Sequence, residues 1–416
     1  METKKYLNAE ESNPNKMEWM KGFPPEENKT LFAADGSFFE FPALRYSVNH
    51  IREFYPTRPV FCGKKGYKFK TKFDDNIDFL EFVPWEEKNP IIWKESLEKN
   101  YTDGIIILHK GKIVYEKYPA GLKQNGVHSA MSVSKSFTGI LAAILIDEGA
   151  INPNKLVKDY IPELKDSGFA DATVRQVLDM TTAVEYSEDY NNKNAEVWKF
   201  SASGNVFRPY DYNGPKNYYE YLKTVKKISG QEHGEIFGYK TVNTELMGWI
   251  ISRVTQKDIT QLISEKIWIP MHANYDGFYQ LGTAGIAFAG GGFSLNLRDM
   301  ALFGELLRNG GKLNGKQIIS QTAVKEVSSG GSKEAFEKSG EYPLLKNWSY
   351  HNMWWITNNS HNAFTARGVH GQTIYVDPTA KTVIARFASN PLASNKYIDP
   401  FSIPAYEAVA DYLMKK

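Results

Sequence analysis

The sequence predicts an α+β protein in which one antiparallel sheet, flanked by helices, is completed by segments far apart in the chain. Strand patterns occur at residues 104–118 and return at 369–387, whereas residues 150–280 alternate helical segments with long polar loops. Strands near both ends of a chain with helices between them are typical of a sheet assembled from distant segments.

The composition is that of a folded globular protein. Of 416 residues, 42% are hydrophobic and 24% are charged, close to the averages of globular domains. The net charge of +2 argues against nucleic-acid and anionic-membrane partners, since both need excess positive charge. We expect a small-molecule partner, and the composition leaves a homodimer open.

Several absences narrow the class of protein further. Cys62 is the single cysteine, so no intramolecular disulfide can form. The longest apolar stretch, 137–146, is too short to span a membrane, and the first residues lack the apolar segment of a secretory signal. The eight histidines have no metal-ligand spacing. We therefore expect a cytoplasmic protein without metal or cofactor.

The first part of the chain divides into an extension, a helix and a hairpin. Residues 1–85 mix Pro, Gly, aromatic and charged residues with little periodicity, so we interpret them as an extension packed on the body. Residues 90–101 have apolar side chains at helical spacing, and 104–108 and 113–118 are two strand patterns around a tight turn.

Helices dominate the middle of the chain. Residues 133–148 form an unbroken helical pattern that Gly149 closes, and 173–180 form a shorter helix that Thr173 caps. The first of these helices is apolar almost all round, which is typical of a buried helix.

The end of the chain returns to strands. Residues 369–376 and 382–387 alternate around the turn 377–381, and an amphipathic helix covers 403–414. We predict three parts in the whole chain. They are an N-terminal extension (1–85), a discontinuous α/β subdomain (86–130 and 285–416) and a mainly helical subdomain (131–284).

A Ser-x-x-Lys motif, Ser132 to Lys135, opens the buried helix at 133–148. Residues three apart share a helix face, so the lysine amine can reach the serine hydroxyl, and free N–H groups at the helix start favour a developing anion. Ser96 and Lys99 satisfy the same pattern in an ordinary amphipathic helix, so the motif alone is weak. A lysine in an apolar wall must be neutral or partnered, which makes Ser132 the candidate nucleophile.

Tyr239 lies at the entrance of another apolar helix. It can simply pack there. The functional interpretation makes its phenol a proton carrier whose pKa, normally about 10, is lowered by a neighbouring ammonium group.

Residues 365–372 contain two glycines directly before an alternating strand. Glycine there allows another backbone or a ligand to approach closely, so a strand N–H could point at a bound carbonyl. The alternative is an ordinary strand entrance.

Together these segments resemble the serine β-lactamase and penicillin-binding-protein superfamily. The resemblance is to the class C-like branch with family VIII carboxylesterases and 6-aminohexanoate-dimer (nylon oligomer) hydrolases. It covers residue 85 to the end, and residues 20–60 look like the N-terminal extension of the nylon-hydrolase-like members. The matching segments are 131–139, 173–182, 239–248, 289–294, 350–355 and 368–372.

The resemblance implies a β-lactamase/transpeptidase-like fold with the active site in the cleft between the sheet and a helical subdomain. It implies Ser132 as nucleophile, with Lys135 and Tyr239 sharing general-base and general-acid work. It also implies an oxyanion hole formed by the backbone N–H of Ser132 and of a residue in the 368–372 strand, for which we choose Val369.

The chain departs from the family pattern at two places. The Tyr-x-Asn loop has Thr241 where the amide usually stands, and the Lys-Thr-Gly triad is missing. Either 366–368 or 370–372 could replace the triad, and we prefer the first because it keeps glycine third. The lysine that receives a β-lactam carboxylate is absent, so we expect weak β-lactamase activity.

Aromatic and strand residues are candidates for substrate binding. Tyr186, Tyr190, Trp198, Trp354 and Trp355 are candidates for a pocket wall. Tyr190 resembles the substrate-contacting tyrosine of nylon-oligomer hydrolases and lies in a polar loop. We expect substrate contacts from Tyr190, Trp198, Thr241, Gly368 and His370.

The resulting hypothesis is a serine hydrolase that cleaves small esters and linear amides of the 6-aminohexanoate-oligomer type through an acyl-enzyme on Ser132. One alternative is a β-lactamase or D-Ala-D-Ala peptidase. Another is a binding protein that keeps the fold without catalysis.

Overall fold

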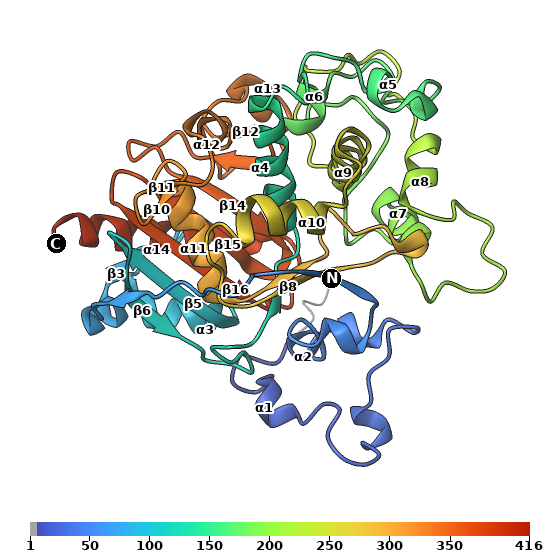
Figure 1. Cartoon of the computed structure of the whole chain (residues 1–416). Coiled ribbons are helices and arrows are strands. Elements are labelled where there is room, and N and C mark those ends of the chain that lie inside the picture. Colours follow the sequence, from blue (N-terminus) through green and yellow to red (C-terminus); the bar gives the residue numbers. More distant parts are fainter. Residues whose placement is uncertain (1–5) are drawn as a thin grey trace.

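The computed structural model describes residues 6–416 and contains one large mixed sheet with helices on both faces (Figure 1). Residues 1–5 of the predicted extension lie outside the described residues. In spatial order the strands are β12 (Ser349–His351), β13 (Trp354–Ile356), β14 (Phe364–Gly368), β15 (Gln372–Asp377), β16 (Thr382–Ala388), β5 (Thr102–His109), β6 (Lys112–Lys117) and β2 (Lys70–Thr71). All neighbours are antiparallel except β2 and β6. The predicted α+β class is confirmed.

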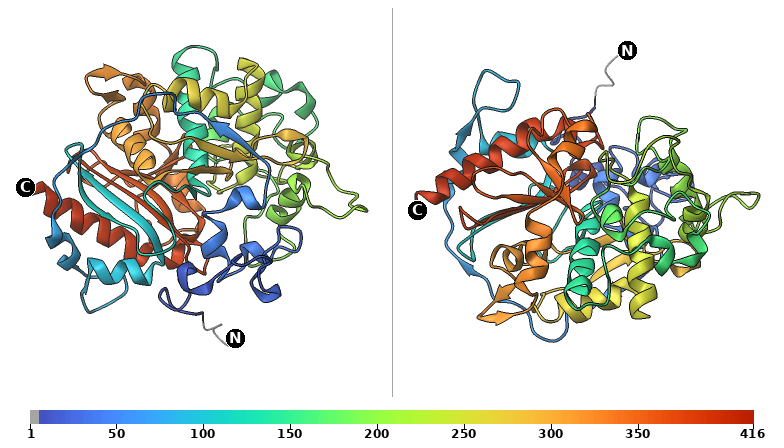
Figure 2. Two further views of the ribbon diagram at one scale, coloured as in Figure 1. Left: turned by 60° about the horizontal axis from the view of Figure 1, so that its bottom comes forward. Right: turned by 90° about the horizontal axis from the view of Figure 1, so that it is seen from above.

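Side chains of the central strands alternate between two cores. On β5, Ile105 and Ile107 face the core that includes α3 (Trp93–Lys99) and α14 (Asp399–Met414). Ile106 and Leu108 face the larger core that includes α4 (Val133–Asp147) and α11 (Leu297–Arg308). This is the period-2 alternation of a strand buried on both faces. Figure 2 shows α14, in red, lying along the sheet.

Helices and long loops share the region between β7 and β8. After α4, its α-helices are α5 (Val157–Tyr160), α6 (Val174–Leu178), α7 (Glu196–Gly204), α8 (Tyr218–Thr224), α9 (Thr241–Thr255) and α10 (Ile259–Ile263). The predicted cap of α6 is present, because the Thr173 side chain accepts a hydrogen bond from the Gln176 N–H. Two further helices, α12 (Gln321–Ser328) and α13 (Lys333–Lys338), precede the strands of the C-terminal part.

A second, smaller sheet lies beside the nucleophile segment. Its antiparallel strands are β1 (Thr57–Val60), β8 (Gly277–Gln280), β9 (Phe293–Leu295) and β7 (His128–Ser129). Two short pairs complete the strands: β3 (Glu81–Phe82) with β4 (Ile91–Ile92), and β10 (Lys312–Leu313) with β11 (Lys316–Gln317). The division into three parts predicted from the sequence stays a prediction.

The N-terminal extension does more than cover the body, since it supplies β1 and β2 to the two sheets. It also contains α1 (Pro14–Met17) and α2 (Leu44–Ser47). Leu44 and Val48 pack against Met131 and Val369, and the Val48 carbonyl accepts a hydrogen bond from the Ser129 N–H. The extension therefore supports the chain immediately before Ser132.

The strand predicted at 369–376 needs a correction. The alternating strand begins at Gln372, and 364–368 form the preceding strand β14. Residues Val369–Gly371 form the tight turn between them, with His370 at a φ of 63°. Short β-hairpin turns require such left-handed residues, and an apolar residue in the turn made it look like the start of a strand.

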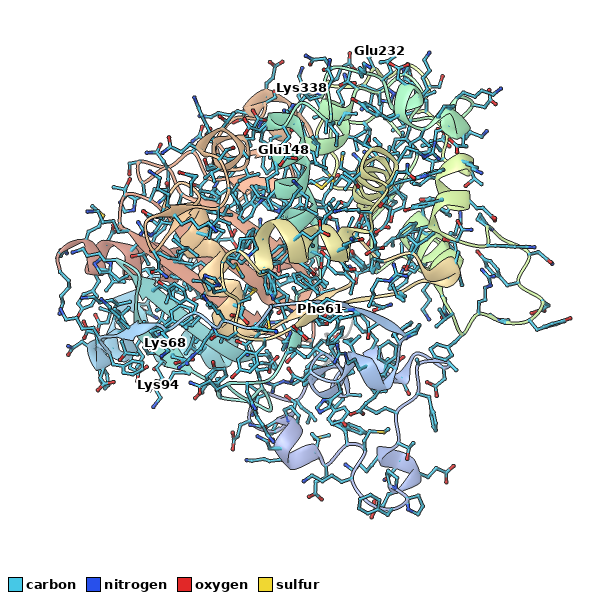
Figure 3. All side chains as sticks on the ribbon, viewed as in Figure 1. Phe61, Lys68, Lys94, Glu148, Glu232 and Lys338 are labelled. Carbon is cyan, nitrogen blue, oxygen red and sulfur yellow. The ribbon has the colours of Figure 1, made fainter. Side chains whose placement is uncertain are left out.

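Charged side chains cover the outside of the molecule. Lys68, Lys94 and Glu232, labelled in Figure 3, are exposed. Within residues 6–416, every helix is too short or too polar to cross a bilayer.

Candidate active site

Ser132 lies on a sharp turn between β7 and α4. Met131 has a φ of 48°, an unfavourable backbone conformation for a non-glycine residue that the surrounding structure must hold in place. Ser132 is the N-cap of α4, yet its side chain makes no capping hydrogen bond. The hydroxyl is therefore available at the helix N-terminus, where partial positive charge gathers.

Lys135 is one helical turn further on and contacts the serine directly. Its Nζ donates to Ser132 Oγ at 2.9 Å and to the Gly290 carbonyl at 2.8 Å. Burial lowers the pKa of Lys135 to about 8, while the carboxylates of Glu188 and Glu245 limit the drop. A pKa near neutrality is what a general base needs.

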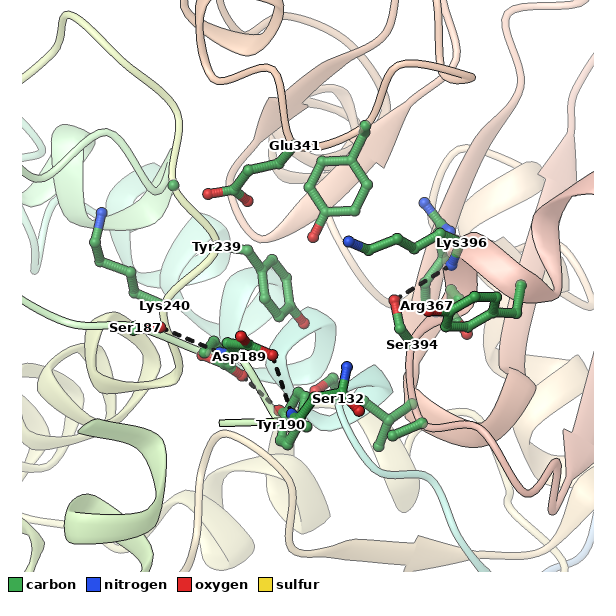
Figure 4. Close-up of a pocket in the computed structure, with 18 of the residues that line it drawn as sticks. Ser132, Ser187, Asp189, Tyr190, Tyr239, Lys240, Glu341, Arg367, Ser394 and Lys396 are labelled. Carbon is green, nitrogen blue, oxygen red and sulfur yellow. Dashed lines mark hydrogen bonds between the residues drawn. The ribbon is translucent and has the colours of Figure 1, made fainter. Parts of the chain in front are cut away.

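Tyr239 completes the cluster from the segment that enters α9. The Lys135 Nζ is 5.0 Å from the centre of its ring, and Figure 4 shows its hydroxyl pointing toward Ser132. The expected fall of its pKa is wrong. Burial and the Glu188 carboxylate raise the pKa of Tyr239 well above 10, and a hydrogen bond with Ser132 opposes the rise only in part. The phenol therefore keeps its proton at neutral pH.

The end of β14 runs past Ser132 at close range. A Cβ on Gly368 would be 2.8 Å from the Ala130 carbonyl oxygen and 3.0 Å from the Ser132 nitrogen, so this position needs glycine. The next residue, Val369, lines the same cavity as Ser132. Neither the Ser132 nor the Val369 N–H donates any of the main-chain hydrogen bonds that connect the described turns and loops. This geometry favours 366–368 over 370–372 as the replacement of the missing triad.

A cavity of about 500 Å³ opens above Ser132 and Tyr239 (Figure 4). Tyr186, Tyr190, Tyr342 and Trp355 give it aromatic walls. Its lining also carries both signs of charge: Glu188, Asp189 and Glu341 are acidic, and Lys240, Arg367 and Lys396 are basic. In Figure 4, Glu341 and Lys396 enter from different sides. A lining with both signs of charge can complement a ligand that carries both an ammonium and a carboxylate group.

Of the five predicted substrate contacts, only Tyr190 lines this cavity. Trp198 is 40% exposed and packs edge-on against Tyr190, because it lies on α7 behind the loop. Thr241 donates both its N–H and its hydroxyl to Glu188. Gly368 touches the Ser132 turn instead.

His370 and Trp354 also lie away from the cavity. The His370 ring is buried and bonds the Asn390 carbonyl at 2.7 Å, since the turn at 369–371 directs it inward. Trp354 is fully buried and donates to the Ser136 carbonyl at 3.1 Å. The pleat of β13 places Trp354 in the core and its neighbour Trp355 at the cavity.

The charged residues of the cavity lining were not predicted from the sequence as site residues, and neither was Glu245, whose charge acts on Lys135. Glu188 binds Thr241 and accepts from the Tyr190 hydroxyl at 2.7 Å. Arg367 pairs with Asp399 and lies 4.6 Å from the centre of the Trp355 ring, and its buried Nη1 has no hydrogen-bond partner among residues 6–416. Glu245 is buried and accepts from the Gly290 N–H at 2.7 Å. Of these residues, only Glu245 could have been noticed in the sequence, because burying a carboxylate within an apolar helix is costly without partners.

The sequence of the chain is similar to those of known proteins. The beta-lactamase family profile matches residues 96–397. The 6-aminohexanoate-dimer hydrolase of Paenarthrobacter ureafaciens is 35% identical over 298 residues, which are 72% of this chain and 75% of that protein.

Solved structures give the same result for the fold. A Bacillus anthracis protein assigned as a 6-aminohexanoate-dimer hydrolase is 31% identical, with a TM-score of 0.83 over 94% of this chain and 99% of its own. A family VIII carboxylesterase shares the fold at 19% identity, with a TM-score of 0.56 over 77% of this chain and 96% of its own. With a profile match over most of its length and a hydrolase relative at 35% identity, the chain belongs to the beta-lactamase family and is one of its serine hydrolases.

Proposed function

We propose that this serine hydrolase cleaves small esters and linear amides of the 6-aminohexanoate-oligomer type, with Ser132 as its nucleophile. The observation that carries the proposal is the 2.9 Å contact between Lys135 Nζ and Ser132 Oγ at the base of an open cavity. An amine whose pKa is lowered to about 8 is free often enough at neutral pH to accept the hydroxyl proton.

In the first half of the reaction, Ser132 Oγ forms a bond to the substrate carbonyl carbon while its proton passes to neutral Lys135. The carbonyl oxygen becomes an oxyanion that accepts hydrogen bonds from the Ser132 and Val369 N–H groups. The oxyanion then collapses to a carbonyl, and the carbon–oxygen or carbon–nitrogen bond breaks. The leaving group takes the hydroxyl proton of Tyr239, and the Lys135 ammonium returns a proton to Tyr239. The acyl group remains on Ser132.

In the second half, a water molecule attacks the acyl carbon and gives its proton to Lys135. A second oxyanion forms in the same place and collapses, so that the bond to Ser132 Oγ breaks. The Lys135 ammonium gives its proton to Ser132 Oγ, which restores the neutral amine, and the free acid leaves. The raised pKa of Tyr239 supports its part as proton donor rather than resting base.

The lining of the cavity supports linear substrates with charged ends. Aromatic rings of Tyr190 and Trp355 offer apolar surface to an alkyl chain, and the lining also contains acidic and basic side chains. A 6-aminohexanoate oligomer has an ammonium group, alkyl chains, amides and a carboxylate. Two features of this strand support the expectation of low β-lactamase activity. Arg367 is already paired with Asp399, and Ala366 stands where the family has lysine.

We also propose a cytoplasmic location and small-molecule substrates for this enzyme. The near-neutral charge of +2 and the single cysteine support a cytoplasmic enzyme that acts on small molecules and not on nucleic acids or membranes. A homodimer stays open.

The test compares wild type with Ser132→Ala on p-nitrophenyl butyrate, the linear 6-aminohexanoate dimer and a chromogenic cephalosporin. We expect ester and amide hydrolysis by wild type, little cephalosporin turnover, and a loss of at least about 10³-fold in kcat/KM for Ser132→Ala. Ser96→Ala is the matched control, because Ser96 opens the other Ser-x-x-Lys pattern, in α3. Equal rates for wild type and Ser132→Ala would end the proposal.

A further inference from the structure

Gly290 connects two buried ionisable groups that come from different helices. Its N–H donates to Glu245 Oε1 on α9 at 2.7 Å, and its carbonyl accepts from Lys135 Nζ on α4 at 2.8 Å. Both side chains are 1% exposed. The carboxylate therefore acts on the lysine across a single residue, without direct contact.

Lys135 is the cation that faces Glu245. The Glu245 charge also acts on four phenols, whose ionisation it disfavours. They are Tyr186 from the cavity loop, Tyr218 and Tyr219 from α8, and Tyr279 from β8. Phenols are neutral near pH 7. Arg253 lies further along α9, and Lys257 and Asp258 lie between α9 and α10. Arg253 and Asp258 act on Tyr219. Glu188 is the other carboxylate that acts on Lys135.

Glu245 also lines a second cavity of about 300 Å³, which shares no lining residue with the cavity above Ser132. Gln256, Lys257 and Asp258 lie on its wall, and Gln256 is exposed. Glu245 therefore borders a cavity other than the one above Ser132.

We propose that Glu245 is a positioning residue for Lys135: it holds Gly290 in place and supplies the negative charge that stabilises the Lys135 ammonium form. The inference rests on the proposed function, because Lys135 is taken as the base. Burial raises the pKa of Glu245, but the Gly290 hydrogen bond and the Lys135 ammonium favour its ionised form, and ionised Glu245 in turn favours the ammonium. Glu245 and Lys135 therefore titrate as a coupled pair.

The test is Glu245→Gln, which keeps the size of the side chain and an oxygen for the Gly290 N–H but removes the charge. Without that charge the Lys135 ammonium is less stable, so the acid limb of the kcat/KM profile should move to lower pH by about one unit. Lys257→Met is the control, because Lys257 lines the same cavity without touching Gly290. Its limb should stay within about 0.2 unit of wild type. A folded Glu245→Gln enzyme with an unmoved limb would overturn the inference.

A second measurement needs neither catalysis nor a substitution at Glu245. NMR titration of the Lys135 side chain in the Ser132→Ala protein, assigned by the signal missing from a Lys135→Met sample, should show two coupled steps. A single step there would overturn the inference even if Glu245→Gln fails to fold. If Ser132→Ala hydrolyses substrate like wild type, the proposed function falls, and the titration still decides the role of Glu245.

Discussion

The side-chain nitrogen of Lys135 lies 2.9 Å from the hydroxyl oxygen of Ser132, at the first turn of a buried helix. As an ammonium group Lys135 can only donate to that oxygen, and as a free amine it can accept its proton. The distance alone fits both states. With the pKa of Lys135 lowered to about 8, about a tenth of the groups are free amines at pH 7, and the amine predominates above pH 8.

Replacing this amine should remove the base without emptying its space. We expect Lys135→Met to lower kcat/KM for p-nitrophenyl butyrate by about 10²–10⁴-fold, the usual contribution of general-base catalysis. Lys99→Met removes the lysine of the second Ser-x-x-Lys pattern, on the exposed side of α3. It should retain wild-type rates, and equal losses in both variants would contradict the assignment.

The pH profile follows from the same pKa. Because only the amine form of Lys135 accepts the proton, kcat/KM should rise with pH and level off above about 8, the value to which burial lowers this pKa. The pKa of Tyr239 is raised above its usual 10, so deprotonation of the phenol should not reduce the rate below pH 10. Initial rates on an ester between pH 5 and pH 10 check this, and a flat profile down to pH 6 would refute it.

Part of this site could be predicted from residue spacing. Ser132 and Lys135 share a helix face in an apolar segment, and that pattern is enough to expect their contact. Tyr239 and Val369 come from distant segments, and no periodicity relates them to Ser132. Only the resemblance to a family suggested that they belong together.

Other features depend on three-dimensional surroundings that a linear pattern does not contain. The direction of the Tyr239 pKa was predicted wrongly, because the cost of burial and the Glu188 carboxylate outweigh the Ser132 hydrogen bond and the Arg367 charge. In the sequence, Glu188 looks like any acidic residue of a polar loop. Only the structure shows that the Thr241 hydroxyl donates to it. The strands β1 and β2 are four and two residues long, too short for alternation to reveal.

Proton donation by Tyr239 should matter more for amides than for esters. An amine must be protonated to leave, whereas a good alcohol leaving group departs as an alkoxide. Tyr239→Phe should therefore lower kcat/KM for the 6-aminohexanoate dimer by about 10²-fold or more, and by clearly less for p-nitrophenyl butyrate. Tyr350→Phe is the control, since its ring lies edge-on to Tyr239 outside the cavity lining. The same loss on both substrates would argue against proton donation.

The N-terminal extension should contribute to stability through Arg45. Its guanidinium is buried, donates to Asp103 at 3.1 Å and to Ser389 at 3.0 Å, and so joins the extension to the main sheet. Arg45→Met leaves the Asp103 carboxylate buried without this charge, which should cost about 3–5 kcal/mol of unfolding free energy. Lys21→Met breaks an exposed pair and should cost less than about 1 kcal/mol. Urea unfolding measures both, and similar midpoints would contradict the prediction.

The oxyanion hole can be tested by removing one N–H and nothing else. Val369→Pro deletes the amide hydrogen, and the preceding Gly368 already has the extended backbone (φ −135°, ψ 152°) that a residue before proline prefers. Val369→Ala removes more of the side chain but keeps the N–H. If that N–H stabilises the oxyanion, Val369→Pro should lower kcat by about 10²–10³-fold while Val369→Ala stays near wild type. Equal effects of the two variants would show that the side chain matters here and the amide does not. Because the apolar contact of Val369 with α2 is weakened in both, their thermal stabilities should match, and this comparison separates loss of the donor from loss of packing.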